Sequence, residues 1–199
     1  MILALIAMFS GSLVAVYEQN VKRMLAYSSV AQIGYIMLGI SLATTTGLAA
    51  GMLHLFNHAL IKGALFMAIG AVVYRTGSAQ LNQLAGLGRK MPWTMAGFVA
   101  AGLCLIGVPL TTGFLSKWYL VNASFDAGHT VIPVMILISS LLAVIYIWKV
   151  VETVYFQPAR PLKPGEEPVT EAPLSMLIPL WVMVALNFGF GLQGKAKIE

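Results

Sequence analysis

The sequence has 199 residues, of which 59% are hydrophobic and only 10% are charged. Soluble domains carry about 25% charged residues, so this composition excludes a sizeable soluble domain and indicates an integral membrane protein. The net charge of +5 is modest and favours contact with anionic lipid over nucleic-acid binding, and one cysteine, Cys104, excludes an internal disulfide.

Six hydrophobic segments follow one another along the chain. Each is near the ~20 residues that a membrane-spanning helix needs, and too long for barrel strands of about 9–11 residues. They predict an all-α, polytopic membrane protein with about six transmembrane helices, in one transmembrane domain over 1–199. The segments are 2–17, 24–43, 48–74, 93–121, 131–156 and 173–192.

The connections between the segments carry the basic residues unevenly. The first, third and fifth connections contain Lys or Arg, whereas the second and fourth contain none. Because Lys and Arg accumulate in cytoplasmic loops, we expect the odd-numbered connections in the cytoplasm and both termini outside. The fifth, 157–172, is then a Pro-rich charged cytoplasmic loop.

The second segment begins at Lys22-Arg23, and on physical grounds this pair is read as a positive-inside anchor. Tyr27, Ser28, Ser29 and Gln32 follow within the apolar run. Such groups bind backbone carbonyls or water chains inside a helical bundle.

The third segment contains His54, His58 and Lys62 at four-residue intervals. On a helix this spacing places them on one face, and a cation at mid-bilayer costs about 2.5–3.5 kcal/mol or more. Proton relay is the favoured use, because a neutral imidazole both donates and accepts hydrogen bonds. The alternative is packing between helices, with the lysine reaching the interface. A zinc site is disfavoured, since Leu55 stands where metalloproteases place a glutamate.

The fourth segment is interrupted by Gly107, Pro109 and Gly113, and Lys117 follows. Proline removes a backbone donor and clashes with the carbonyl four residues earlier, so a broken helix is expected. Broken helices at membrane depth mark ion sites in transporters. A simple proline kink with a lysine that reaches the interface is the other interpretation.

The fifth segment contains Lys149 and Glu152 near its expected cytoplasmic end. Their i, i+3 spacing allows an ion pair, which is either an anchor at the interface or a further proton-transfer pair. Asp126 and His129 occupy a short outer connection. No motif for a catalytic site, phosphate, haem or metal occurs, so no catalytic residue and no cofactor is predicted.

Four motifs in the same order resemble the proton-conducting antiporter family, which comprises the antiporter-like subunits of complex I and membrane-bound hydrogenases and the large subunits of Mrp-type cation/proton antiporters. They lie at 20–29, 32–35, 54–66 and 107–118. The amino-acid sequence at 113–119 and 147–152 is most similar to that of the D-type large subunits of the Mrp antiporters.

This resemblance implies a fourteen-helix fold with two inverted repeats, of which this chain would supply the second repeat and the last helix. Lys117 then matches the key lysine of the broken helix, and His58 and Lys62 match the central relay. His54 matches that relay in some members. Lys22 matches a lysine that links the relay to the other half-channel.

The first eight helices of that pattern have no counterpart here, so the sequence is expected to be a fragment or a split subunit whose partner supplies the other half-channel. The expected function is proton translocation within a multi-subunit complex in a bacterial or archaeal plasma membrane, with Na⁺ exchange as an option. A subunit of an NADH-quinone oxidoreductase or membrane-bound hydrogenase, an assembly subunit without transport, and a solute transporter with a midplane site are the alternatives.

Overall fold

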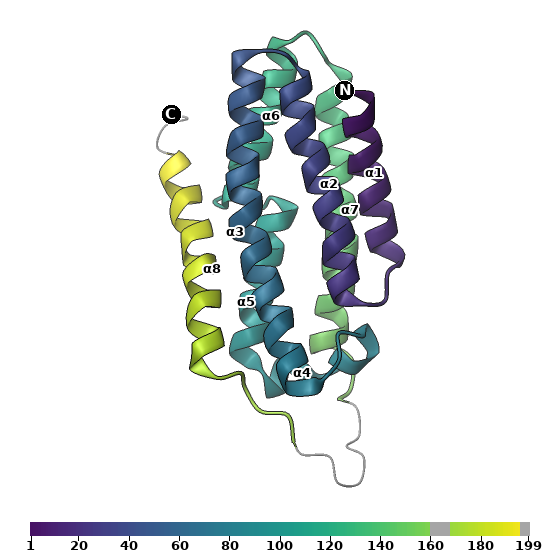
Figure 1. Ribbon diagram of the computed structural model, residues 1–199, viewed down its shortest axis with the longest axis vertical. Coiled ribbons are helices and arrows are strands. Elements are labelled where there is room, and N and C mark those ends of the chain that lie inside the picture. The colour runs from purple at the N-terminus through teal and green to yellow at the C-terminus, as the bar shows by residue number, and fades with distance from the viewer. Residues whose placement is uncertain (160–167, 196–199) are drawn as a thin grey trace.

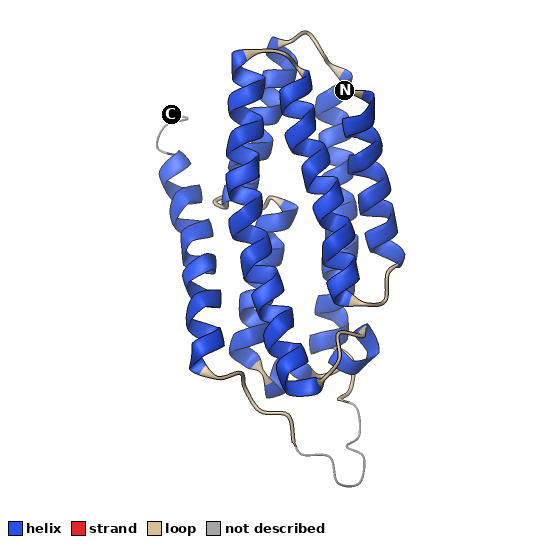
Figure 2. Ribbon diagram, in the orientation of Figure 1, coloured by secondary structure: helices blue, strands red, loops and turns tan. Residues whose placement is uncertain are grey.

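The computed structural model describes residues 1–159 and 168–195, and within them the chain is helical apart from its turns (Figure 2). The elements are α1 (Ile2–Tyr17), α2 (Val21–Ser41), α3 (Thr45–Thr76), η1 (Leu81–Leu84), α4 (Leu87–Lys90), α5 (Pro92–Ile106), α6 (Thr112–Asp126), α7 (Val131–Tyr155) and α8 (Leu174–Lys195).

Four of these helices, α2, α3, α7 and α8, are long and apolar enough to cross a bilayer individually. The helices α1 and α5 are apolar but shorter, with 16 and 15 residues. The predicted segment 93–121 corresponds to two helices, α5 and α6, which are separated at Gly107–Thr111. The all-α prediction is confirmed, and a total of about six membrane crossings stays a prediction.

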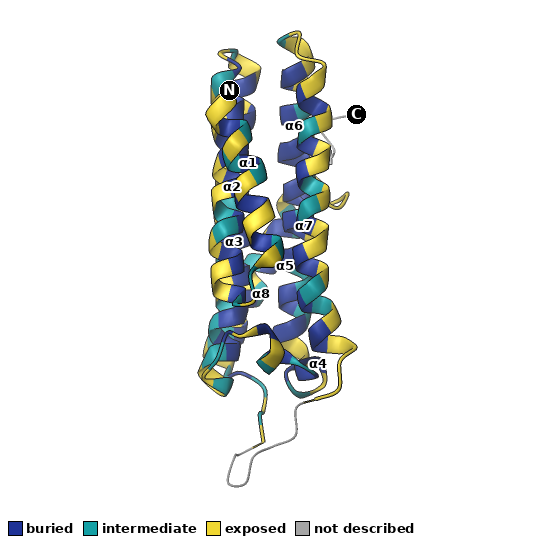
Figure 3. Ribbon diagram, turned by 90° about the vertical axis from the view of Figure 1, so that its right-hand side faces the viewer, coloured by how far each residue is buried: buried dark blue, intermediate teal, exposed yellow. Residues whose placement is uncertain are grey.

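Helix α3 is the centre of the bundle and contacts α2, α5, α6 and α8 (Figure 1). Seen from the side, α1, α2 and α3 form one layer, and α6 and α7 lie opposite (Figure 3). Buried residues line the space between the layers and exposed apolar residues face outward. This is the arrangement expected of a bundle whose outer surface contacts lipid or other membrane helices.

Glycines allow α1, α2 and α3 to pack closely. A Cβ atom on Gly11 would lie 2.7 Å from the backbone nitrogen of Ala31, and one on Gly34 would lie 2.7 Å from that of Met8. Small residues at helix contacts allow such backbone approach in membranes. Gly11 and Gly34 therefore let the backbones of α1 and α2 come into direct contact.

The turns that carry Lys and Arg share one end of the bundle. The α1–α2 turn, the η1–α4 region and the start of 156–173 lie at the lower end of Figure 1, while the α2–α3 and α6–α7 turns lie at the upper end. Positive-inside topology requires this segregation. Which end faces the cytoplasm stays a prediction.

The predicted charged loop 157–172 is described only in part, because 160–167 lie outside the described residues. Its last part is fixed to α5 by Glu171. One carboxylate oxygen accepts from the backbone N–H of Trp93 at 2.7 Å, and the other accepts from the Thr94 hydroxyl at 2.5 Å. Since Met91 provides no side-chain cap for α5, Glu171 satisfies the free N–H groups at its start.

Candidate functional site

Lys117 lies at the interruption between α5 and α6 and is 7% exposed. Its Nζ donates to the backbone carbonyl of Leu105 at 3.0 Å and to that of Ile106 at 2.9 Å. The same nitrogen lies 5.2 Å from the centre of the Tyr35 ring on α2. An ammonium group is therefore held inside the bundle by two carbonyl dipoles and an aromatic face.

The sequence of the interruption explains why these carbonyls are free. Pro109 cannot donate to the carbonyl of Leu105, four residues earlier, and its ring would clash there. Gly107 ends α5 in the left-handed region at φ +92°. Thr111 then caps α6 by accepting from the N–H of Phe114. The last turn of α5 is left with unpaired carbonyls, and Lys117 occupies two of them.

Gly113 provides the close approach between the two half-helices. A Cβ atom at this position would overlap the carbonyl oxygen of Cys104, and an L side chain at Gly107 would lie 3.2 Å from Cδ of Lys117. The helix-break residues predicted from the sequence, Gly107, Pro109 and Gly113, thus each have a distinct steric part in forming the Lys117 site.

His54 lies beside this site on α3 and is 2% exposed. One ring nitrogen, Nδ1, lies 2.9 Å from the hydroxyl of Ser116, and Nε2 lies 3.1 Å from the side-chain oxygen of Gln32. Because the Gln32 oxygen only accepts, Nε2 carries a proton in this arrangement. The imidazole therefore connects α6 to α2, and its ring lies 5.2 Å from that of Tyr35.

Lys62 occupies a second buried basic site, two helical turns further along α3, and is 6% exposed. Its Nζ donates to the backbone carbonyl of Leu25 at 2.8 Å and to the hydroxyl of Ser28. The same Leu25 carbonyl also accepts from the Ser28 hydroxyl at 2.9 Å. Lys62 thus binds a single carbonyl of the continuous helix α2, which it shares with Ser28. Lys117, in contrast, binds two free carbonyls at the end of α5.

His58 lies between His54 and Lys62 and is half-buried. Its Nδ1 atom is buried and has no hydrogen-bond partner within the described parts of the chain. The three α3 groups therefore form a row, in which only the middle member has a free ring nitrogen. Such an atom can bind water or a transferred proton.

A buried amide network ties α3 and α8 to the start of α6. The side-chain nitrogen of Asn57 donates to the Thr112 carbonyl at 2.8 Å, and the Thr112 hydroxyl donates to the side-chain oxygen of Asn187 at 2.8 Å. Sequence reasoning did not assign these residues. The sequence signal that could have found this network is Asn57, a polar side chain one position before His58 in an apolar run.

Lys22 lies apart from this interior. It is exposed at the first turn of α2, and the described structure gives it no side-chain hydrogen bond or ion pair. Its predicted part in proton transfer stays a prediction.

The ion pair that the spacing of Lys149 and Glu152 allows does not form in this structure, and their possible part in proton transfer stays a prediction. Lys149 turns toward α1 and donates to the carbonyls of Val16 at 3.2 Å and Glu18 at 3.1 Å, while Glu152 is exposed. Among the described residues the one ion pair joins Arg23 to Glu18. The free carbonyls at the end of α1 outcompete the neighbour on the same helix.

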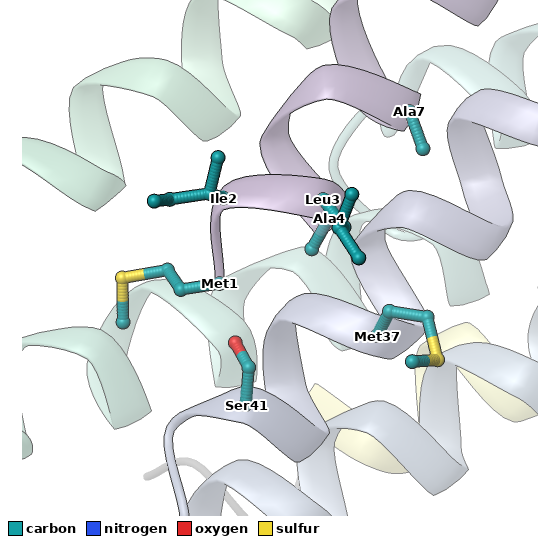
Figure 4. Close-up of a pocket in the computed structure, with 7 residues that line it drawn as sticks. All are labelled: Met1, Ile2, Leu3, Ala4, Ala7, Met37 and Ser41. Carbon is teal, nitrogen blue, oxygen red and sulfur yellow. The ribbon is translucent and has the colours of Figure 1, made fainter.

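The surface groove at the start of α1 lies away from the basic row (Figure 4). It is lined by apolar side chains of α1 together with Met37 and Ser41 of α2, and offers no titratable side chain. In the described residues no three His, Cys, Asp or Glu side chains are grouped to hold a metal ion. Within the described residues the buried basic side chains are Lys117, His54 and Lys62, and the half-buried His58 lies between the last two. Lys117 together with the three α3 groups is called the basic row below.

Apolar helices long enough to cross a bilayer, with lysine and histidine buried between them, define a polytopic integral membrane protein. Residues 1–144 match the family described as NADH:quinone oxidoreductase/Mrp antiporter, TM, and the chain belongs to this family.

Three comparisons show how far the likeness extends. NADH-quinone oxidoreductase subunit N of Desulforudis audaxviator is 43% identical over 182 residues, which cover 87% of this chain and 36% of that protein. A chain of the Mrp complex from Dietzia superposes with a TM-score of 0.89 at 27% identity, over 97% of this chain and 43% of the other. A chain of an archaeal membrane-bound sulfane sulfur reductase gives a TM-score of 0.85 at 32% identity, over 94% and 31%. The chain thus spans less than half the length of each.

Proposed function

We propose that this chain is part of a proton-translocating membrane subunit, in which Lys117, His54, His58 and Lys62 carry the proton. The single observation that carries the proposal is Lys117, a buried lysine held on two backbone carbonyls at a broken helix. Buried basic residues in a membrane protein are expensive unless they have a use. Family membership supports the same function.

The geometry supports a stepwise relay. Lys117 and His54 lie against the same Tyr35 ring, whose centre is 5.2 Å from Lys117 Nζ and 5.2 Å from the ring centre of His54. Because the ring itself carries no transferable proton at this face, a proton would pass between the two groups through water. His54 and Lys62 flank His58, which has a free ring nitrogen. A proton that leaves the Lys117 ammonium breaks one N–H bond and forms one on the acceptor. Each group returns to its starting state when it passes a proton on.

The wider assignment belongs to the same proposal. The chain would supply the second inverted repeat and the last helix of a fourteen-helix subunit, and the rest of the path would come from helices beyond this sequence or from a partner subunit. The superposition over 97% of this chain but 43% of the Mrp chain supports this placement. Lys22 would then link the buried basic residues of this chain to the other half-channel.

Two parent complexes are supported by different observations. The motif wording at 113–119 and the TM-score of 0.89 favour an Mrp-type antiporter, with this chain resembling its D-type large subunit and exchanging H⁺ for Na⁺. The 43% identity to subunit N favours a redox-driven quinone oxidoreductase. Proton transport that starts on addition of Na⁺, without an electron donor, identifies the first, and transport that needs a donor identifies the second.

The test is proton uptake into inverted membrane vesicles that contain the assembled complex. Lys117→Ala should abolish uptake while the complex still assembles on native gels. Lys149→Ala is the matched control, because it removes a lysine that also donates to two carbonyls but lies outside the row. Undiminished uptake with Lys117→Ala would refute the proposal and leave a subunit whose polar groups only hold helices together.

A further inference from the structure

Helix α8 contacts the helix break at two points that the basic row does not include. At the first, a Cβ atom on Gly191 would lie 2.5 Å from the carbonyl oxygen of Leu110 and 2.6 Å from the carbonyl carbon of Thr111, so the two backbones are in direct contact. Leu110 has φ +76°, a left-handed conformation that is disfavoured for residues with a side chain and persists only where the surroundings hold it. The packing of α8 therefore supports the backbone of the break.

The second contact is a hydrogen bond between two fully buried side chains. The Thr112 hydroxyl, in the first turn of α6, donates to the side-chain oxygen of Asn187 at 2.8 Å, and both residues are 0% exposed. The side-chain nitrogen of Asn187 donates to the carbonyl of Met183, one turn earlier on α8, at 2.8 Å. This bond orients the amide so that its oxygen faces Thr112.

Thr112 also contacts the hydroxyl that binds His54. Its backbone carbonyl accepts from the side-chain nitrogen of Asn57 at 2.8 Å and from the Ser116 hydroxyl at 3.3 Å. The Ser116 oxygen also lies 2.9 Å from Nδ1 of His54. Side chains of α8, α6 and α3 thus form a continuous hydrogen-bonded line from Asn187 to His54.

The Ser116 hydroxyl has one proton and more than one acceptor within reach. While Nε2 of a neutral His54 carries its proton toward Gln32, Nδ1 is a bare acceptor, so the Ser116 hydroxyl donates to it. Nδ1 can bind a proton only after that hydroxyl turns away. The Thr112 carbonyl at 3.3 Å and the Gly113 carbonyl at 3.4 Å are the acceptors that the hydroxyl then meets.

We propose that Asn187 is a positioning residue of α8, which holds the Thr112 carbonyl where it receives the Ser116 hydroxyl when His54 binds a proton. This inference rests on the proposed proton translocation and adds α8 to it. No covalent bond of Ser116 breaks, since the hydroxyl turns about its Cβ–Oγ bond. The incoming proton forms one N–H bond at Nδ1, and the group that supplies it loses one bond to hydrogen. When His54 releases this proton, the hydroxyl returns to Nδ1.

The experiment replaces each partner of the α6–α8 hydrogen bond and measures proton uptake by vesicles that contain the assembled complex. Thr112→Val and Asn187→Leu should each lower uptake about tenfold, which corresponds to a barrier increase of about 1.4 kcal/mol. Thr112→Ser keeps the hydroxyl and should restore the uptake that Thr112→Val loses. Gln193→Leu is the matched control, because it removes an exposed amide from the same helix, and it should change nothing.

The double variant Thr112→Val/Asn187→Leu separates positioning from stability. Each single variant leaves one buried polar group without its partner and should lower the melting temperature, whereas the double variant replaces both groups with apolar ones and should recover most of that loss. Because both substitutions remove the same bond, uptake by the double variant should stay about tenfold low. Uptake that recovers together with the melting temperature would overturn the inference and leave the hydrogen bond a structural contact.

Lys117→Ala in the same vesicles distinguishes failure of this inference from failure of the proposed function. Full uptake by Thr112→Val and Asn187→Leu, where Lys117→Ala is inactive, overturns the positioning role and leaves the proposed function standing. Full uptake by Lys117→Ala refutes the proposed function, and the positioning role of Asn187 falls with it.

Discussion

Lys117 and Lys149 make the same contacts in two regions of the molecule. Each donates from Nζ to two backbone carbonyls at the C-terminal end of another helix, α5 for Lys117 and α1 for Lys149. Lys149 is half-buried at the end of the bundle, and the Glu18 carboxylate lies near enough to interact with its charge. Lys117 is buried, and the described residues give it no acidic partner.

If the proposed function holds, contacts alone do not define a proton site, because Lys117 and Lys149 make the same contacts at different depths in the bundle. At the end of the bundle, a lysine that caps a helix contributes to stability. Inside the bundle, the same contacts hold a charge that is costly to bury in a membrane. We therefore expect the two lysines to respond differently to substitutions that preserve the charge.

Substitution of each lysine by arginine should give the largest difference between the two sites. Arginine keeps the positive charge and the donors but does not release its proton in proteins. Lys117→Arg should lower proton uptake by at least about 100-fold, the low end for loss of a proton-transfer group. Lys149→Arg should leave uptake within about twofold of the unaltered protein, because capping requires only charge and donors.

Uptake assays on vesicles with matched amounts of assembled complex measure both variants. Equal losses for the two arginine variants would show that the two sites have the same use, and the proposed distinction would then be wrong. Retained uptake in Lys117→Arg would mean that a fixed charge is sufficient there.

The second prediction concerns the approach of the half-helices that creates the Lys117 site. Gly113→Ala places a Cβ atom onto the Cys104 carbonyl oxygen, and both are backbone-positioned atoms that cannot rotate away. The free energy of unfolding should fall by about 3 kcal/mol, the upper end for overpacking. Gly70→Ala is the control, since a Cβ atom there meets nothing within 4 Å, and it should stabilise α3 by about 0.5–1 kcal/mol.

Unfolding in mixed detergent micelles, followed by circular dichroism, measures both glycine variants. A Gly113→Ala protein as stable as Gly70→Ala would show that α5 and α6 do not require this contact.

The sequence predicted the interruption well because its cause is local. Pro109 and Gly107 act on their own backbone neighbours, so position along the chain is sufficient to expect a break. The sequence does not predict which distant groups a long side chain such as Lys149 will bind. The i, i+3 rule paired Lys149 with Glu152, yet the free carbonyls of α1, more than 130 positions earlier, attract the ammonium.

The row on α3 shows a second limit. A four-residue interval drifts by about 40° around an α-helix, so the three groups do not point in one direction. His54 faces Ser116 on α6 and Gln32 on α2, whereas Lys62 faces Leu25 on α2. The spacing predicted a shared stripe. The partners depend on the packing of α3 among its neighbours, which composition does not specify.

The third prediction concerns how much the capping of α1 by Lys149 contributes to stability. Lys149→Met keeps most of the apolar stem but removes the donors to Val16 and Glu18, so the free energy of unfolding should fall by about 1 kcal/mol. Lys22→Met is the control for stability, because its side chain is exposed near the same end. The same detergent unfolding assay applies, and an equal effect for the two would contradict a capping contribution from Lys149.

The smallest expected effect is on how stability depends on pH at the α1–α2 turn, where Glu18 lies near Lys149. The backbone N–H of Asn20, followed by that of Gln19 and by the Arg23 guanidinium, holds the pKa of the Glu18 carboxyl below its usual range. A carboxyl whose pKa is lower in the folded state stabilises the fold above its unfolded pKa, near 4.3, and loses that contribution as pH falls. Glu18→Gln should therefore lower the melting temperature slightly at pH 7 and leave it unchanged near pH 3. Glu152→Gln, an exposed carboxyl near the same end, is the control, and an equal pH dependence in both variants would show that the α1–α2 turn does not depend on the Glu18 charge.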